Sequence, residues 1–229
     1  MISIVIRTRN EASWIGRCLA ALKEQDYPDV EIIVVDNESR DDTLKLVNRF
    51  DCRLLTISER DFTPGRSLNL GISAARGDLI AMLSGHCIPM HDKWLRRLAV
   101  AFTGPEIAGV YGRQEPLPDT SDLDKRDLWT TFGLDRRVQV RDYFFHNANS
   151  MIRRDVWEAM PFSEHLSSVE DRDWAKRVLE LGYKIMYEPA AIVYHFHGIH
   201  HGGDEMRAAR VVRVIELIKN GETLRERDR

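Results

Sequence analysis

Three short groups of polar residues each follow an apolar run directly, and their side chains could bind a nucleotide together. Carboxylates, amides and hydroxyls hydrogen-bond ribose and base edges, whereas histidine and arginine meet phosphate. Two common nucleotide motifs are excluded, because the chain has neither G-x-G-x-x-G after its first apolar run nor G-x-x-x-x-G-K-[ST]. The candidate residues are Thr8, Arg9, Asn10 and Glu11 in the first group, Asp36 and Asn37 in the second, and Ser84, Gly85 and His86 in the third.

The elements that must position these groups repeat one pattern: an apolar run, a turn and a helical segment. Such alternation predicts βαβ units in an α/β fold, with a mostly parallel twisted sheet flanked by helices. The carboxyl ends of parallel strands meet at one edge, where these folds bind ligands. Taken singly, each polar group also fits a helix cap or an Asx turn. We expect strands at 2–8, 30–36, 53–58 and 79–84, and helices at 11–25, 39–50, 65–77 and 91–102.

The pattern changes after residue 114. Residues 115–129 are rich in proline and acidic residues, which predicts a loop and a helix outside the sheet. Residues 144–160 predict a short strand that leads into a helix, followed by a further helix ending at Gly182 and a final strand or pair of strands. The tail predicts a last helix that folds back onto the domain through one apolar face, formed by Met206, Ala209, Val212 and Ile215.

The composition is that of a soluble globular protein, with 43% hydrophobic and 30% charged residues. A formal net charge of −3 argues against nucleic acid as the partner. The three cysteines are scattered, which indicates a reducing compartment. No apolar run has the length of a membrane span or the pattern of a signal peptide. We therefore expect a cytoplasmic protein.

Histidines gather in the segment "VYHFHGIHHGG", which holds four of the eight in the chain. His195 and His197 alternate along the predicted final strand, so they project from one face if that strand continues. His200 and His201 follow in a glycine-bounded turn, where they could contact acceptor or phosphate. The competing interpretation is a histidine-lined surface or packing at the strand end.

The opening stretch, "SIVIRTRNEASWIGRCLAALKEQDYPDVEIIVVDNESRDDT", resembles that of family 2 glycosyltransferases of the GT-A fold. The stretches "GRSLNLGISAARGDLIAMLSGHCIP", "HNANSMIRRDVWE" and "VEDRDWAKRVLELGYKI" resemble, in order, the family's donor-lining, acceptor-side and E-D segments. The resemblance covers residues 2–197 and implies a single GT-A domain over 1–229. It implies a nucleotide-sugar-binding half at 1–114, an acceptor and catalytic half at 115–197, and a C-terminal helix within 198–229.

The resemblance also implies an activity: inverting transfer of a sugar from a nucleotide-sugar donor to a hydroxyl of a saccharide or glycolipid acceptor. Such an enzyme would serve polysaccharide biosynthesis in the cytoplasm or peripherally at the inner face of the membrane. The three polar groups would bind the donor together with Arg66 and Asn69. The acceptor side would comprise Asn147, Asn149, Glu170 and His197, with Asp171 as the catalytic base.

Asp171 has a structural interpretation beside the catalytic one. Glu170, Asp171 and Asp173 would lie in the first turn of a helix that Ser168 can cap, where the helix dipole favours carboxylates. The dipole lowers a carboxylate pKa, whereas a general base gains from a raised one. Burial or the neighbouring Glu170 must therefore offset the dipole if Asp171 is the base.

The chain departs from the family at its fourth predicted strand. Members usually carry Asp-x-Asp there, which binds the ribose and a divalent metal at the donor diphosphate. With Ile88 and Pro89 aligned, Ser84 and His86 occupy the two acidic positions. The usual metal site is therefore altered.

Three explanations fit this departure. His86 ligates a metal as neutral imidazole with His195 or His197, which favours Mn²⁺, Fe²⁺ or Zn²⁺ over Mg²⁺. Alternatively, protonated His86 meets the phosphate with Arg9 or Arg66. In the third, the donor carries one phosphate, as a CMP-activated sugar does, and needs no metal.

Two other functional classes remain open on the residues alone. A metal-dependent hydrolase could be built on the histidine cluster. A nucleotide-sugar-binding module without catalysis would explain the missing acidic motif, because folds keep binding sites when chemistry is lost.

Overall fold

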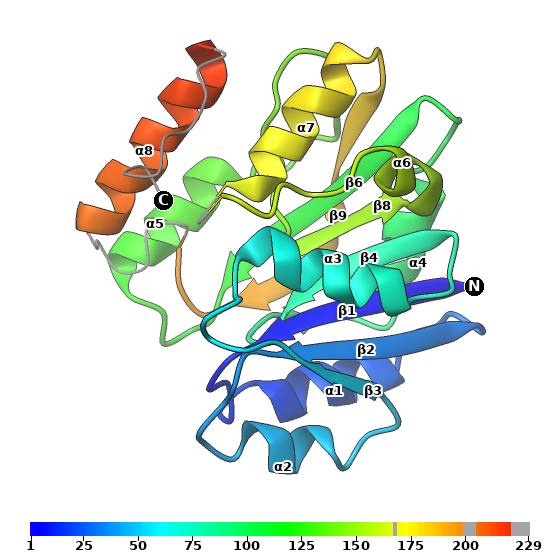
Figure 1. Ribbon diagram of the computed structural model, residues 1–229, viewed down its shortest axis with the longest axis vertical. Coiled ribbons are helices and arrows are strands. Elements are labelled where there is room, and N and C mark those ends of the chain that lie inside the picture. The colour runs from blue at the N-terminus through cyan, green and yellow to red at the C-terminus, as the bar shows by residue number, and fades with distance from the viewer. Residues whose placement is uncertain (167–168, 199–204, 221–229) are drawn as a thin grey trace.

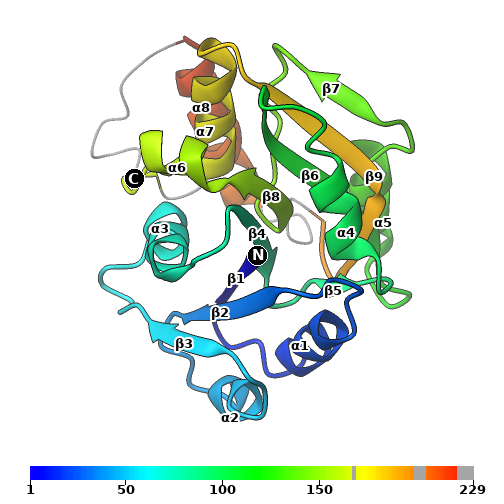
Figure 2. The ribbon, with the colours of Figure 1, turned by 90° about the vertical axis from the view of Figure 1, so that its right-hand side faces the viewer.

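The computed structural model describes residues 1–166, 169–198 and 205–220. One sheet of nine strands runs through them in the order β3-β2-β1-β4-β8-β6-β9-β5, and β7 pairs with β9 (Figures 1 and 2). The strands are β1 (Ile2–Thr8), β2 (Val30–Asp36), β3 (Arg53–Thr56), β4 (Leu79–Ser84), β5 (Ile88–Pro89), β6 (Ile107–Pro116), β7 (Arg137–Gln139), β8 (Asn149–Arg153) and β9 (Lys184–His195).

The first half of the sheet is parallel, as predicted. Strand β1 pairs with β2 on one side and β4 on the other, which sets Thr8 opposite Asp36 and Arg7 opposite Ser84. The chain order therefore reverses at β1, and the carboxyl ends of β1 and β4 form a switch point of the kind that binds ligands in open α/β sheets. All three polar groups follow strands that end at this edge.

The second half of the sheet is mixed, which corrects the expectation of a mostly parallel sheet there. Strand β8 runs antiparallel to both β4 and β6, while β6 and β9 are parallel. Strand β6 was not predicted at all, and it is the longest neighbour of β9. Its pairing places β9 in the same sheet as β1 and β4, and the end of β9 reaches the switch point.

Helices cover both faces of the sheet (Figure 2). Helices α3, α6 and α7 pack on one face through Leu68, Val156 and Trp174, and α1 and α4 pack on the other through Leu19 and Trp94. In the described residues no helix combines the length and apolar composition that a membrane crossing requires. The helices are α1 (Ile15–Lys23), α2 (Thr43–Val47), α3 (Pro64–Ala74), α4 (Trp94–Val100), α5 (Asp122–Thr131), α6 (Arg154–Ala159), α7 (Glu170–Glu180) and α8 (Glu205–Asn220).

Helix α8 forms where the sequence predicts it, but its packing face differs. Val214 is buried and packs against Leu166 and Val169. Val212, which we expected to pack, is 51% exposed, and Ala209 is exposed as well. The side chains of Met206 and Ile215 lie outside the described residues. Among the described side chains of α8, Val214 therefore contacts the domain next to the start of α7.

Candidate active site

The loops after β1 and β2 are joined by reciprocal hydrogen bonds. The backbone N–H of Asn10 donates to Ser39 Oγ at 2.8 Å, and the N–H of Arg40 donates to Asn10 Oδ1 at 2.8 Å. Asn10 has a φ of 52°, a left-handed conformation that asparagine tolerates better than most residues. Asp36 is fully buried and accepts from the N–H and the hydroxyl of Ser39 at 2.9 and 2.5 Å. Asp36 thereby orders the loop, as an Asx turn would, and its contact with a nucleoside stays a prediction.

Two buried polar groups at this edge have no hydrogen-bond partner in the described part of the chain. They are the side-chain amide of Asn37, which is 2% exposed, and the hydroxyl of Thr8, which is 4% exposed. Unsatisfied buried polar groups are costly and therefore uncommon. Their presence at the predicted donor site fits a surface that is completed by a ligand.

Gly85 is required by the close approach of β1 and β4. A Cβ on this residue would lie 2.9 Å from Thr8 Oγ1 and 3.1 Å from Thr8 Cβ. The backbone N–H of Gly85 also donates to the carbonyl of Arg7 at 2.9 Å, which holds the turn against the end of β1. The glycine therefore sets the position of His86, the next residue.

We expect Gly85→Ala to destabilise the protein by about 1–3 kcal/mol, because the added methyl group overpacks a buried contact. The matched control is Gly16→Ala in α1, where a Cβ would meet only Leu46 Cδ2 at 3.9 Å. That helical substitution should stabilise by about 0.5–1 kcal/mol. Urea unfolding of the two variants would contradict this account if both changed stability in the same direction.

A cluster of three histidines lies at the switch point, and it contains the residues that the first of the three explanations requires. The Nε2 atoms of His86 and His195 are 2.9 Å apart. The rings of these two residues lie 4.9 Å apart between centroids, and the ring of His197 lies 4.9 Å from His86 and 4.5 Å from His195. His86 Nδ1 also contacts Glu11 Oε1 at 2.6 Å. His200 and His201 lie outside the described residues.

The histidine pair is the core of a candidate metal centre. Among the described residues, the side chains whose ligand atoms come together are His86, Cys87 and His195. Cys87 is fully buried, and burial raises the pKa of its thiol well above the ordinary value, which opposes a reactive thiolate in the metal-free protein. The same burial excludes Cys87 as a catalytic thiol.

The acidic pair at the start of α7 lies at the same edge of the sheet. Glu170 is buried and accepts from Arg7 Nη1 at 3.2 Å and from Asn147 Nδ2 at 3.3 Å. Asp171 is half-buried and accepts from the backbone N–H groups of Asn147 and Arg172 at 3.3 and 2.8 Å. Two segments that are far apart in sequence therefore hold this pair.

Burial raises the pKa of Asp171, and burial together with the Asp171 charge raises the pKa of Glu170. The Arg172 and Arg7 charges act in the opposite direction on Asp171 without cancelling the effect of burial. Desolvation therefore offsets the effect of the helix dipole on the pKa of Asp171, as a general base at this position requires. Asn147 contacts both carboxylates, so the structure brings it into the site.

The start of α7 is itself unusual. Val169 precedes the helix with a φ of 60°, and among the described residues no side chain caps the helix there. A β-branched residue in this left-handed region is strained, and such strain gathers at functional sites. Ser168, the expected cap, lies outside the described residues.

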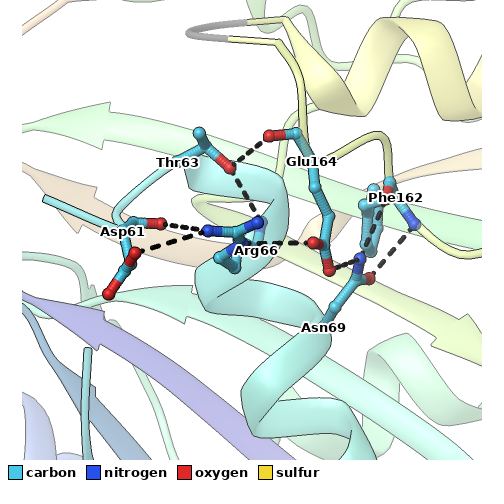
Figure 3. A network of polar contacts seen from close by, with 6 residues as sticks. All are labelled: Asp61, Thr63, Arg66, Asn69, Phe162 and Glu164. Atoms are coloured by element: carbon cyan, nitrogen blue, oxygen red, sulfur yellow. Dashed lines mark hydrogen bonds and ion pairs between the residues drawn. The ribbon is translucent and has the colours of Figure 1, made fainter. Parts of the chain in front are cut away.

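Arg66 and Asn69 belong to a separate polar network, drawn in Figure 3. Arg66 Nε donates to Glu164 Oε2 at 3.2 Å, and Asn69 Nδ2 donates to Glu164 Oε1 at 3.0 Å. Asn69 also bonds the backbone of Phe162 and the indole of Trp157. Its amide is therefore fully engaged in holding α3 to the segment after α6. A donor contact through Arg66, which is partly exposed, stays a prediction.

Asn149 does not lie at the surface, which corrects its placement on the acceptor side. Its side chain is fully buried, accepts from Trp94 Nε1 at 2.8 Å, and donates to the carbonyls of Arg113 and Ala191 at 2.9 Å. Every hydrogen-bonding atom of the amide is directed into the core. Asn149 is thus a structural residue that joins β8 to its neighbours.

Arg9 does not join the histidines either. Its guanidinium bonds Glu59 at 2.5 Å and is 43% exposed. The arginine at the site is Arg7, which the sequence analysis missed. A charged residue inside an apolar strand that is buried on both faces was the available signal, because such a charge needs a partner.

The family follows from comparison with known proteins. Residues 3–160 match the family model described as glycosyl transferase family 2. The chain belongs to this family. The glycosyltransferase AglE from Haloferax volcanii is 31% identical to this chain over 204 residues. The match covers 85% of this chain and 66% of AglE. The O-antigen chain rhamnosyltransferase RfbN of Salmonella typhimurium is 29% identical, with 86% and 66% covered.

Solved structures show the same GT-A fold. The mannosyltransferase PcManGT from Pyrobaculum calidifontis, solved with GDP-Man and Mn²⁺, superposes with a TM-score of 0.72 at 20% identity over 92% of this family 2 chain and 61% of its own. TarS 1–349 of S. aureus with UDP-GlcNAc gives 0.69 at 19% identity, over 98% and 68%. The chain spans just under two thirds of the length of the first curated relatives it matches.

Proposed function

We propose that this family 2 chain transfers a sugar from a nucleotide-sugar donor to a hydroxyl of a saccharide or glycolipid acceptor, with inversion at the sugar C1. The observation that carries the proposal is the position of the Asp171 carboxylate, which the backbone N–H groups of Asn147 and Arg172 hold beside the buried Glu170–Arg7 pair at the end of β1. Support comes from the relatives, which include a rhamnosyltransferase and another named glycosyltransferase. Glycosyl transfer needs a base of this kind next to the donor site.

In this mechanism the acceptor hydroxyl attacks C1 from the face opposite the leaving nucleotide. Asp171 takes the hydroxyl proton, the new C1–O bond forms, and the electron pair of the old C1–O bond leaves with the donor phosphate. The raised pKa brings the base closer to the operating pH and so strengthens it. Asn147 and Arg172 fix the carboxylate through their backbone N–H groups, which limits its rotation.

We further assign the donor diphosphate to the histidine edge, with a divalent cation held by His86 and His195. The two Nε2 atoms lie 2.9 Å apart, close enough for both imidazoles to serve as ligands of one ion. Imidazole ligands favour Mn²⁺ or Zn²⁺ over Mg²⁺. When bound, the cation would neutralise charge on the leaving phosphate.

Two measurements test the transfer. Thermal shifts with UDP, GDP, dTDP and CMP, each with and without Mn²⁺, should identify one nucleotide that stabilises by about 2.7 kcal/mol at 100 times its Kd. Proton NMR of the product with the matching donor should show the anomeric configuration opposite to that of the donor. Binding without turnover across a panel of acceptors would instead favour a non-catalytic module. Zn²⁺-dependent donor hydrolysis that is lost in His195→Ala would favour a hydrolase.

We also propose peripheral association with an anionic membrane, which would bring the chain to a glycolipid acceptor. The supporting surface surrounds β7, where Leu134, Val138 and Val140 are 70%, 51% and 57% exposed. Arg137 and Arg141 lie exposed within the same short stretch. Apolar side chains flanked by arginines suit a surface of anionic headgroups over acyl chains.

We expect Leu134→Ser combined with Val140→Ser to lower binding to anionic vesicles by about tenfold or more. Each substitution removes about 1–2 kcal/mol of the favourable free energy of burying an apolar side chain in the membrane. Vesicle sedimentation would measure the bound fraction. Val100→Ser is the matched control, since Val100 is 62% exposed on α4. Equal binding of the control and the double variant would reject this surface.

A further inference from the structure

The carboxylate of Glu11 contacts the histidine cluster. Glu11 follows β1 and so lies outside the position after β4 where family members usually carry Asp-x-Asp. Its Oε1 lies 2.6 Å from His86 Nδ1, and both side chains are largely shielded, at 19% and 17% exposure. A carboxylate of this kind accepts hydrogen bonds, so His86 Nδ1 must carry the proton in this contact. With Nδ1 donating to Glu11, a neutral His86 ring accepts at Nε2, the atom that lies 2.9 Å from His195 Nε2.

We propose that Glu11 is a positioning residue for a histidine-bound divalent cation: it fixes the tautomer and ring orientation of His86 so that the Nε2 atoms of His86 and His195 converge on one ion. This inference rests on the cation in the proposed function. A carboxylate that accepts the second ring N–H of a ligating histidine orients the ligand and raises its basicity. The Glu11–His86 contact has that connectivity.

The backbone of Glu11 is held from the neighbouring loop, which explains why its side chain stays in place. Its N–H donates to Thr43 Oγ1 at 2.7 Å. Thr43 is fully buried and bonds Asp41 Oδ1 through both its hydroxyl and its N–H, at 2.5 and 3.0 Å. The N–H of Ala12 also donates to Asp41, at 3.1 Å. The residues at the start of α2 therefore fix the position of the Glu11 backbone, and the Glu11 carboxylate in turn orients His86.

The test is a metal titration of purified protein at one fixed pH, with Zn²⁺ and Mn²⁺ as probes and Mg²⁺ for comparison. Glu11→Gln keeps the size of the side chain, but its amide can accept from or donate to Nδ1 and so permits both tautomers of His86. We expect it to raise the Zn²⁺ Kd about 10–100-fold. Glu158→Gln, the same change at a 58% exposed side chain on α6, should leave the Kd unchanged.

A spectroscopic readout separates positioning from a general loss of structure. Nitrogen-15 NMR of the metal-free protein should show His86 protonated at Nδ1 in the wild type and a mixture of tautomers in Glu11→Gln, with the signal assigned by its loss in His86→Gln. Thr43→Val removes the hydroxyl that holds the Glu11 backbone and should weaken Zn²⁺ binding in the same direction by a smaller factor. These variants keep the inference testable if one of them folds poorly.

The outcomes are distinct. Unchanged Zn²⁺ affinity and an unchanged tautomer in Glu11→Gln would overturn the role of Glu11 and leave the cation site standing. A wild type that binds neither Zn²⁺ nor Mn²⁺ would overturn both the cation in the proposed function and this inference. Tight Zn²⁺ binding that depends on Glu11, in a protein without glycosyl transfer, would support the inference and refute the proposed reaction.

Discussion

Asp171→Asn should lower kcat by about 10²–10⁴-fold while leaving the affinity for the donor nucleotide unchanged. The amide has nearly the shape of the carboxylate but cannot take the acceptor proton, and general-base catalysis is worth a factor of that size. The loss should appear in kcat and not in nucleotide binding, because Asp171 bonds Asn147 and Arg172 and contacts none of the strand-end residues that we assign to the donor. Steady-state kinetics and calorimetry with the nucleotide would measure the two quantities.

Asp173→Asn is the matched control for this prediction. Asp173 lies in the same first turn of α7, but its Oδ2 pairs with Arg177 at 2.8 Å, one turn further along the helix. The substitution removes one carboxylate from the same helix terminus and so reproduces the change in dipole interaction. We expect kcat within a factor of about two to three of wild type, since an exposed i,i+4 pair contributes only about 0.3–0.5 kcal/mol. An equal loss of kcat in both variants would show that these carboxylates stabilise the helix and would contradict Asp171 as the base.

The pH dependence of kcat provides a second signature of the base. Asp171 must be ionised to accept a proton, so activity should fall as pH drops through its pKa. Burial raises that pKa, which moves the acid limb above the ordinary aspartate value of about 3.9. An acid limb at or below that value would contradict Asp171 as a base with a raised pKa. The measurement is kcat as a function of pH with saturating donor and acceptor.

The parts of the site that could be predicted are those fixed by strand geometry. The ends of β1, β2 and β4 had to share an edge, because their hydrophobic runs and connections require parallel pairing. Alternation along the final strand placed His195 and His197 on one face only if that strand continued, but β9 ends at His195 and His197 lies in the bend that follows. Their contact with His86 came from the family resemblance, since no local rule places the end of β9 beside β4.

Strand β6 was not predicted because its two glycines, Gly109 and Gly112, have low strand propensity. Both glycines lie where the tertiary packing leaves no room for a side chain. A Cβ at Gly109 would lie 3.1 Å from Trp174 and 3.2 Å from Phe145, and one at Gly112 would lie within 2.1 Å of the carbonyl oxygen of Ala191. These neighbours come from segments far along the chain. Local propensity therefore opposed the assignment, and long-range contacts decided it.

The structural contacts of Asn69 and Asn149 have the same explanation. Asn69 bonds Glu164, which lies 95 positions away, and Asn149 bonds Ala191, which lies 42 positions away. An asparagine side chain suits a ligand and a core contact equally well, so residue type cannot separate the two. Only the partners that the fold supplies show that both amides are engaged in structure.

Arg7→Met should destabilise the protein by about 3 kcal/mol near neutral pH, the lower end of the range for a broken buried ion pair. Arg7 and Glu170 have side-chain exposures of 20% and 5%, so methionine leaves a buried carboxylate without its charge partner. For a domain of this size the loss corresponds to about 6–12 °C in Tm. Arg40→Met, at an 80% exposed side chain paired with Glu59, should cost less than about 1 kcal/mol.

The loss in Arg7→Met should depend on pH in a defined direction. Burial and the Asp171 charge raise the pKa of Glu170, and the Arg7 charge lowers it, so the pKa in the folded variant rises further. The folded state then binds a proton more tightly than the unfolded state, whose glutamate pKa is about 4.3. Stability is therefore retained at pH below that value and lost as pH rises through the folded pKa.

Arg7→Met combined with Glu170→Gln removes the buried carboxylate that lacks a charge partner and should recover most of the stability at pH 8. Chemical denaturation of the single and double variants at pH 5 and pH 8 decides the matter, because a merely packing role for Arg7 predicts an equal loss at both pH values and no recovery.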